Sequence, residues 1–281
     1  MDIIENAEQM YKISLSINKN NKSIGFVPTM GALHEGHLSL VKESKKNNVV
    51  TIVSIFVNPI QFGPKEDLTK YPRTFESDCE MLKKEGVDFL FFPGAAEMYG
   101  ENYETYVELM KLPAYLCGLS RPGHFRGVST VVTKLFQIVR PDNAYFGQKD
   151  FQQCMVIKKL VRDLNFYIKI NICKILREND GLAMSSRNRY LNVQERKDAL
   201  ILYQSIKLAV SLIQNGLSKT DEIIKKMKAF IKKGVPYAKI DYINIVDDET
   251  LEDVKNAVKS NVIVLAVYIG KTRLIDNHII E

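Results

Sequence analysis

The chain has 281 residues, of which 46% are hydrophobic and 26% are charged, and its formal net charge is +6 at pH 7. This composition is typical of globular proteins, and the length fits one large domain or two modest ones. The longest apolar stretches, residues 49–57 and 262–269, have the length of strands and fall far short of the roughly 20 residues of a membrane helix, which argues against an integral membrane protein.

Apolar runs alternate with amphipathic segments up to about residue 176. Strands are predicted at residues 24–28, 50–57, 87–92, 143–147 and 167–176. Helices are predicted at residues 36–46, 75–85, 127–139 and 150–164. Because continuous apolar strands that alternate with helices are typical of a parallel sheet covered on both faces, residues 1–176 are predicted to form an α/β domain.

The pattern changes after Arg177. Long helices are predicted at residues 193–214 and 220–233, followed by strands at residues 241–246, 262–269 and 272–275. This order indicates a smaller α+β domain over residues 177–281.

The first polar motif directly follows the predicted strand at residues 24–28 and runs from Pro28 to His37. In open α/β sheets, ligands lie at the carboxyl ends of the strands, and a helix N-terminus there offers free N–H groups and a positive dipole end to phosphate. His34 and His37 can both face such a site and donate to phosphate oxygens. The alternatives are a plain surface turn, or a zinc site, which would need further Cys or His ligands nearby.

A second polar motif, residues 180–188, supplies the hydroxyls of Ser185 and Ser186 and the guanidinium of Arg187. Such groups can bind a triphosphate and stabilise the charge of departing pyrophosphate. Because serine is also a favoured helix cap, a capping loop is the alternative.

Three further motifs carry polar side chains. Gln61 follows the second predicted strand, and its amide can donate and accept, which suits an acid that carries hydroxyls, although a plain Asn-Pro turn is the alternative. Residues 121–127 gather three cationic or titratable side chains, or form a basic surface loop. Residues 145–153 combine the end of a predicted strand, a glycine turn and the start of a predicted helix. Lys149 can neutralise the charge of a phosphate there. Asp150 can cap the helix, or accept a hydrogen bond from a ribose or from a metal-bound water.

The sequence H-x-G-H at residues 34–37 resembles the H-I-G-H motif of the nucleotidyltransferase and class I aminoacyl-tRNA synthetase superfamily. Residues 184–187, Met-Ser-Ser-Arg, resemble a variant of that superfamily's K-M-S-K-S loop. The motifs between them narrow the resemblance to the pantothenate synthetase family, over nearly the whole chain. It implies a Rossmann-like ATP- and pantoate-binding domain at residues 1–176 and a C-terminal α+β lid at residues 177–281. The implied reaction joins (R)-pantoate and β-alanine to (R)-pantothenate through a pantoyl adenylate, converting ATP to AMP and pyrophosphate with Mg²⁺.

The resemblance also assigns roles to residues of this sequence. For catalysis it implies His34, His37, Lys149, Ser185, Ser186 and Arg187. For ATP binding it implies Pro28, Thr29, Met30, Gly31, His34, Gly36, His37, Gly147, Lys149, Asp150, Met184, Ser185, Ser186 and Arg187. For pantoate binding it implies Gln61, Gln153, Met30, Arg121 and His124. Asp78 resembles a carboxylate near the metal site, and the alternative for it is a free acid on a helix face.

Two positions depart from the family pattern. Cys117 stands where the family has a glutamate in L-E-G, and Gln148 stands where members often have a glutamate before the lysine. No functional role is assigned to either position.

The four cysteines, at positions 79, 117, 154 and 173, are scattered and form no C-x-x-C pair, so they are predicted to be reduced thiols of a cytoplasmic protein. The N-terminus lacks the basic start and apolar run of a secretory signal. The resemblance suggests a homodimer that binds small molecules, and no nucleic-acid-binding motif is present. Another adenylyltransferase of the same superfamily, which keeps AMP on its product, and a basic RNA-binding module are the alternative functions.

Overall fold

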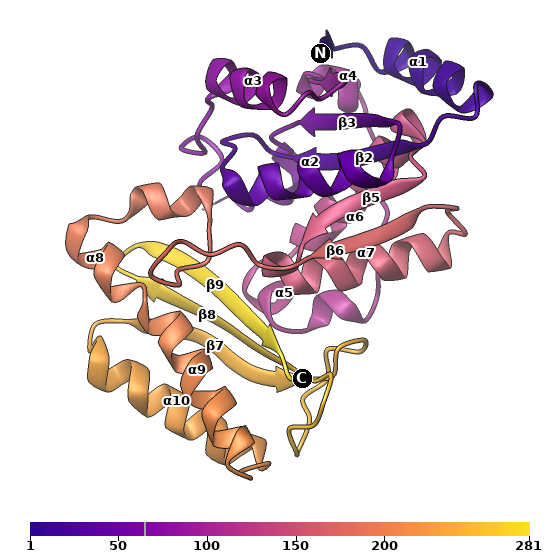
Figure 1. The fold of residues 1–281 in the computed structure, drawn as a ribbon. Coiled ribbons are helices and arrows are strands. Elements are labelled where there is room, and N and C mark those ends of the chain that lie inside the picture. The colour runs from indigo at the N-terminus through magenta and orange to yellow at the C-terminus, as the bar shows by residue number, and fades with distance from the viewer. Residues whose placement is uncertain (65) are drawn as a thin grey trace. The chain divides into compact units, whose positions relative to one another are not determined.

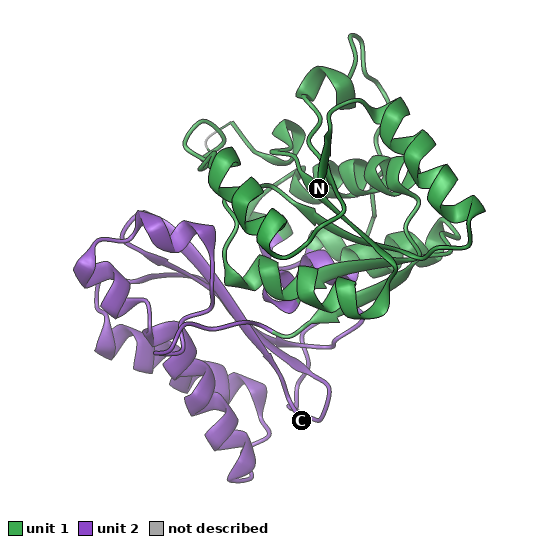
Figure 2. Cartoon of the chain, turned by 45° about the horizontal axis from the view of Figure 1, so that its top comes forward, with its two compact units in different colours: residues 1–114, 118–147, 156–174 green, residues 115–117, 148–155, 175–281 purple. Residues whose placement is uncertain are grey.

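The computed structural model describes residues 1–64 and 66–281. The chain folds as two compact units, coloured separately in Figure 2. Unit 1 comprises residues 1–114, 118–147 and 156–174, and unit 2 comprises residues 115–117, 148–155 and 175–281. The segment that carries Lys149 therefore belongs to unit 2, although the strand before it belongs to unit 1.

Unit 1 is built on a six-stranded parallel sheet in the order β1-β4-β3-β2-β5-β6. Its strands are β1 Asp2–Ile4, β2 Ile24–Thr29, β3 Val50–Ile55, β4 Phe89–Phe91, β5 Asn143–Gly147 and β6 Lys169–Cys173. Of these strands, Figure 1 labels β3, β2, β5 and β6. The predicted parallel α/β sheet is confirmed, and β1 is an additional short strand that pairs with β4.

The helices associated with this sheet begin and end as follows: α1 Ala7–Lys19, α2 Glu35–Asn47, α3 Phe75–Lys84, α4 Ala95–Met98, α5 Cys117–Ser120, α6 His124–Val139 and α7 Phe151–Asp163. The amphipathic pattern explains α6, whose buried apolar residues follow the helical spacing of three and four: Val128, Val131, Val132, Leu135, Phe136 and Val139. Short 3₁₀ helices are η1 Pro59–Gln61, η2 Leu112–Ala114, η3 Gln148–Asp150 and η4 Ser186–Tyr190.

The register of the central strands places two of the polar motifs at one edge of the sheet. β2 and β3 pair along their whole length, and Thr29 pairs with Ile55. Every residue of β3 is buried, as a central strand with both faces covered requires. The turn after β2 and the segment after β3 therefore leave the sheet side by side.

Unit 2 contains a three-stranded antiparallel sheet in the order β7-β8-β9. Its strands are β7 Lys239–Val246, β8 Val262–Ile269 and β9 Thr272–Ile279, and its helices are α8 Val193–Asp198, α9 Ile201–Gln214 and α10 Thr220–Gly234. Apolar residues of α9, α10 and the sheet form one core that includes Ile206, Ile223, Met227 and Leu265. The predicted smaller α+β region is confirmed, but the single helix predicted at residues 193–214 is wrong, because the chain turns at Ala199 and Leu200.

No helix within the described residues is long and apolar enough to span a bilayer.

Candidate active site

The turn between β2 and α2 carries the histidine motif. Gly31 and Ala32 have positive φ angles of 80° and 51°, which reverse the chain just after the strand. His34 precedes α2, and its Nδ1 accepts a hydrogen bond from the Gly36 N–H at 3.1 Å. The imidazole rings of His34 and His37 lie 4.1 Å apart between centroids. The structure thus brings both histidines together at the N-terminus of α2, where a neutral His34 ring carries its proton on Nε2.

Asp78 holds this turn in place from α3. The residue is 1% exposed. Its Oδ2 accepts from the Ala32 N–H at 2.9 Å, and its Oδ1 accepts from the Leu33 N–H at 2.9 Å and from the Thr74 hydroxyl at 3.0 Å. Asp78 is therefore not a free acid on a helix face. Three donors already face its carboxylate, so its assignment as a metal ligand stays a prediction that this geometry does not favour.

The described residues offer no protein cage for a metal ion. Across residues 1–64 and 66–281, no group of three or more His, Cys, Asp or Glu side chains is arranged to hold one. The zinc alternative for His34 and His37 therefore gains no further ligand from the part of the chain that the structure describes.

A cavity of about 270 Å³ lies at the carboxyl ends of β2 and β3. Met30 and Gly31 line it from the turn after β2, Phe56 lines it from the segment after β3, and Arg73 and Asp78 also contribute. Met30 is the residue that this cavity shares with the predicted pantoate site.

Gln61 ends η1, and its side-chain amide is held in one orientation. Its Oε1 accepts from the Asn58 Nδ2 at 2.9 Å, and its Nε2 lies 3.1 Å from the Met30 sulfur. The Tyr99 hydroxyl donates to the Asn58 Oδ1 at 2.7 Å, and burial raises the pKa of that hydroxyl, so it remains a donor. The Nε2 end of the Gln61 amide therefore faces the Met30 side chain.

Arg121 and His124 join the same region of unit 1. The His124 Nδ1 lies 2.9 Å from the Gln61 carbonyl oxygen, and the Arg121 Nη1 lies 3.1 Å from the His124 Nε2. Arg121 also donates to both oxygens of Glu66, at 2.7 and 2.6 Å. Burial raises the pKa of the Glu66 carboxyl, but the hydrogen bond and charge of Arg121 outweigh it and leave the pKa below its usual value.

In unit 2, Lys149 lies in η3, and its ammonium nitrogen is 3.0 Å from the Asp150 Oδ2. Gln153, the second predicted pantoate ligand, is half-buried in the first turn of α7. The neighbouring residue Gln152 binds the short segment of residues 115–117, which also belongs to unit 2. Its Oε1 accepts a hydrogen bond from the Cys117 N–H at 3.0 Å.

The serine-rich loop is held from several sides within unit 2. The Ser185 hydroxyl accepts from the Arg187 N–H at 3.3 Å and caps η4, so the capping interpretation is confirmed. The Asn188 amide donates to the Ala183 carbonyl at 3.1 Å and to the Glu178 carboxylate at 2.9 Å. These contacts fix the loop backbone and leave the capping role compatible with phosphate binding.

The predicted site residues thus form two sets. Unit 1 holds one set: Pro28, Thr29, Met30, Gly31, His34, Gly36, His37, Gln61, Asp78, Arg121, His124 and Gly147. Unit 2 holds the other: Lys149, Asp150, Gln153, Met184, Ser185, Ser186 and Arg187. The sequence did not identify Asn58, Tyr99 and Glu66 as supports of the first set, although Asn58 belongs to the Asn-Pro motif.

Known proteins that resemble this chain match it over nearly its whole length. A family model described as Pantoate-beta-alanine ligase matches residues 2–279. A curated protein from Thermosipho africanus named pantothenate synthetase is 55% identical over 280 residues, which cover 100% of both chains. One of the same name from Caldicellulosiruptor bescii is 53% identical over 281 residues, covering 100% of this chain and 99% of the relative.

Solved structures agree. The crystal structure of pantothenate synthetase from Thermus thermophilus is 40% identical, with a TM-score of 0.94, and the match covers 100% of this chain and 99% of the other. That of pantoate-beta-alanine ligase from Francisella tularensis, complexed with beta-gamma ATP and beta-alanine, is 40% identical with a TM-score of 0.82, over 99% and 97% of the two chains.

Proposed function

The chain belongs to the pantoate–β-alanine ligase family and is a ligase of pantothenate biosynthesis, and we propose that it joins the two substrates through a pantoyl adenylate formed from ATP. The structural observation that carries this proposal is the pair His34 and His37 at the N-terminus of α2, directly beyond the carboxyl end of β2. Imidazole N–H groups and the positive dipole end of a helix in that place favour the phosphates of a nucleotide.

The chemistry follows from the poor reactivity of a carboxylate. Its leaving group in a direct attack by an amine would be oxide. Attack of the pantoate carboxylate oxygen on the α-phosphorus of ATP forms one P–O bond, breaks the bond to pyrophosphate and gives a mixed anhydride. The uncharged amine of β-alanine then attacks the acyl carbon, AMP departs, and the nitrogen loses a proton as the amide forms.

The protein's contribution to these steps is positioning and charge stabilisation, without a covalent enzyme intermediate. His34 and His37 act on the phosphates from unit 1. Lys149 is proposed to act on the α-phosphate as it gains charge, and Ser185, Ser186 and Arg187 on the phosphates and departing pyrophosphate. The remaining ATP contacts are proposed at backbone and small residues: Pro28, Thr29, Met30, Gly31, Gly36, Gly147, Asp150 and Met184.

Pantoate is proposed to bind where Gln61 and Met30 meet. The Asn58 contact occupies the Gln61 Oε1, so the Gln61 Nε2 is the group that donates to an oxygen of the acid. The adjacent cavity of about 270 Å³ supports a small ligand rather than a whole nucleotide. Gln153, Arg121 and His124 complete the proposed set.

Mg²⁺ is proposed to arrive on the phosphates of ATP. This ion usually keeps several waters and is bound by substrate phosphates with one or two carboxylates, and it neutralises phosphate charge when bound. The geometry does not favour Asp78 as one of those carboxylates, because its oxygens already accept hydrogen bonds from Ala32, Leu33 and Thr74. No step of the proposed reaction uses a protein-bound metal.

The predicted homodimer, cytoplasmic location and lid role of residues 177–281 remain proposals. The described cysteines are all free thiols, which supports a reducing compartment. Sedimentation equilibrium of the protein would give twice the mass of one chain if the dimer is correct.

Measuring pyrophosphate release with pantoate and ATP, with and without β-alanine, tests the function. We expect a burst of about one pyrophosphate per active site without β-alanine, because the adenylate stays bound, and continuous turnover with free AMP once β-alanine is added. An adenylyltransferase that keeps AMP on its product would turn over without β-alanine and release no AMP, and would contradict the proposal.

A further inference from the structure

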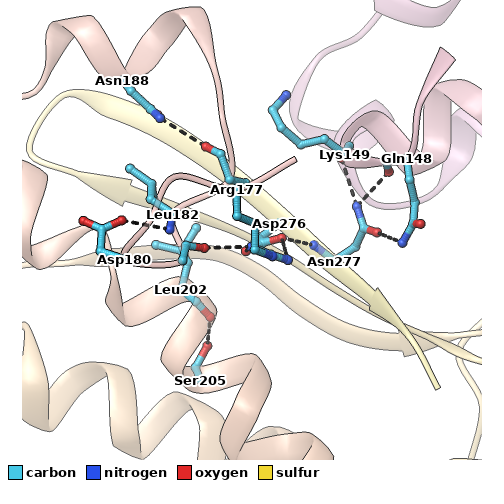
Figure 3. A network of polar contacts seen from close by, with 12 residues as sticks. Gln148, Lys149, Arg177, Asp180, Leu182, Asn188, Leu202, Ser205, Asp276 and Asn277 are labelled. Carbon is cyan, nitrogen blue, oxygen red and sulfur yellow. Dashed lines mark hydrogen bonds and ion pairs between the residues drawn. The ribbon is translucent and has the colours of Figure 1, made fainter. Parts of the chain in front are cut away.

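The side chain of Asn277 on β9 holds the turn that carries Lys149. Its Nδ2 donates to the carbonyl oxygens of Gln148 and Lys149, at 2.9 and 3.0 Å, and its Oδ1 accepts from the Gln148 Nε2 at 3.1 Å (Figure 3). Asn277 is 3% exposed, so its polar groups depend on these partners rather than on water. Gln148, which the sequence leaves without a role, thereby fixes which end of the Asn277 amide faces the two carbonyls.

Asn277 is itself held rigidly. Asn277 pairs with Val264 of β8 in the antiparallel sheet. The carboxylate of its neighbour Asp276, which is also 3% exposed, accepts hydrogen bonds from both terminal nitrogens of Arg177. The Asp276 Oδ1 additionally accepts from the Asn277 N–H at 2.8 Å. The side-chain amide that binds the Lys149 turn is therefore attached to a well-anchored position of β9 in unit 2.

This arrangement has a direct consequence for the lysine side chain. The two carbonyls that Asn277 binds flank the Lys149 Cα, so the peptide planes on both sides of that atom are fixed. The Lys149 ammonium lies at the end of a flexible chain, and rotation of either plane would swing it away from its direction. A displacement of about 1 Å at a reacting centre costs up to roughly 10²-fold in rate, even when the substituted residue is distant from the chemistry.

We propose that Asn277 is a positioning residue for Lys149: it touches no substrate and aims the ammonium by binding the Gln148 and Lys149 carbonyls. This inference rests on the proposed action of Lys149 at the α-phosphate. It adds to the site a residue that lies 128 positions away from Lys149 in the chain and outside every motif of the sequence.

The test is single-turnover formation of pantoyl adenylate by the full-length enzyme, with Asn277→Ala, Lys149→Ala and the double variant. Asn277→Ala should slow adenylate formation about 10- to 100-fold and change the ATP dissociation constant by less than about 3-fold. In the Lys149→Ala background the same substitution should change the rate by less than about 3-fold, because the group that Asn277 aims is gone. If Asn277 had a purely structural role, Asn277→Ala would slow adenylate formation by the same factor in the Lys149→Ala background as in the wild type.

Two further variants separate positioning from folding. Asn277→Asp keeps the shape of the side chain but removes both N–H donors, so it should slow adenylate formation as Asn277→Ala does. Asn261→Ala is the matched control, because Asn261 is 5% exposed in the same unit and its Oδ1 accepts from the Val258 N–H, away from the Lys149 turn. It should lower the melting temperature and leave the rate of adenylate formation unchanged.

A wild-type rate in both Asn277 variants, beside a slow Lys149→Ala enzyme, would overturn this inference alone. Loss of the fold in both Asn277 variants would also overturn it, because the residue would then support the whole unit. If Lys149→Ala itself keeps the wild-type rate, the proposed role of Lys149 is wrong, and the inference falls with it.

Discussion

The Asp276 carboxylate accepts hydrogen bonds from both terminal nitrogens of Arg177, at 2.7 and 2.9 Å (Figure 3). Burial raises the pKa of the Asp276 carboxyl, and the Arg177 guanidinium opposes that rise. Arg177 also donates to the Gly181 carbonyl at 3.1 Å and lies 4.1 Å from the ring centroid of Tyr203. The pair therefore fastens the start of the serine-rich loop to β9.

Asp276→Asn should destabilise the protein strongly, because it leaves the Arg177 charge without its counter-ion in a mostly buried place. Breaking a buried pair in this way typically costs about 3–5 kcal/mol of the free energy of unfolding. Urea unfolding followed by circular dichroism measures the change. Glu8→Gln serves as the control, since the side chains of its ion pair with Lys12 are 73% and 70% exposed and the pair should contribute nothing measurable. Equal midpoints for the two variants would show that the buried pair is unimportant.

Gln61→Ala should weaken the use of pantoate far more than the binding of ATP. The substitution removes a hydrogen-bond donor to a charged or polar oxygen, which typically costs about 1.5–3 kcal/mol, or roughly 10- to 100-fold in kcat/KM for pantoate. Steady-state kinetics with each substrate varied, beside ATP binding by calorimetry, makes the comparison. An equal loss for both ligands would refute the assignment of Gln61.

Asp78→Asn should lower stability without changing the need for Mg²⁺. The amide cannot accept as Asp78 does from the Ala32 and Leu33 N–H groups, so about 1–3 kcal/mol of the free energy of unfolding should be lost. Half-saturation by Mg²⁺, measured at fixed ATP, should stay at the wild-type concentration. A raised Mg²⁺ requirement in a variant of wild-type stability would instead favour Asp78 as a metal ligand.

Glu66→Gln should reduce stability in a pH-dependent way. The folded-state pKa of the Glu66 carboxyl lies below its unfolded value of about 4.3, so the pair with Arg121 stabilises the fold above that pH and loses its effect as the pH falls through the folded pKa. The melting temperatures of wild type and variant should differ most well above the unfolded pKa and converge as the pH falls through the lowered pKa of the folded state. A difference that is the same at every pH would contradict a charge-based contact.

The sequence predicts the sheet of unit 1 well because burial and chain order agree there. β3 is buried at every residue, so its apolar run marks the strand without ambiguity. The polar motifs after β2 and β3 follow directly in the chain, and parallel pairing brings their ends together. The sequence is less informative in unit 2. The apolar pattern of residues 193–214 continues through the turn at Ala199, so the pattern alone does not mark the end of α8.

The supports of the site could not be predicted, because their partners are distant in the chain. Asn58 and Tyr99 are 41 residues apart, and Gln148 and Asn277 are 129 residues apart. Nothing in the local pattern around Tyr99 or Asn277 distinguishes a hydrogen-bonding partner from any other polar residue. The packing of η3, residues 148–150, against β9 likewise depends on a partner that is distant in the chain rather than on local sequence.

The most direct test of the reaction follows an oxygen atom. Pantoate labelled with ¹⁸O in its carboxylate is converted with ATP and β-alanine, and the products are examined by mass spectrometry. If the carboxylate attacks the α-phosphorus and AMP leaves from the acyl carbon, one ¹⁸O atom appears in AMP and none in pyrophosphate. Unlabelled AMP, or ¹⁸O in pyrophosphate or inorganic phosphate, would contradict the adenylate intermediate and with it the roles proposed for His37 and Lys149.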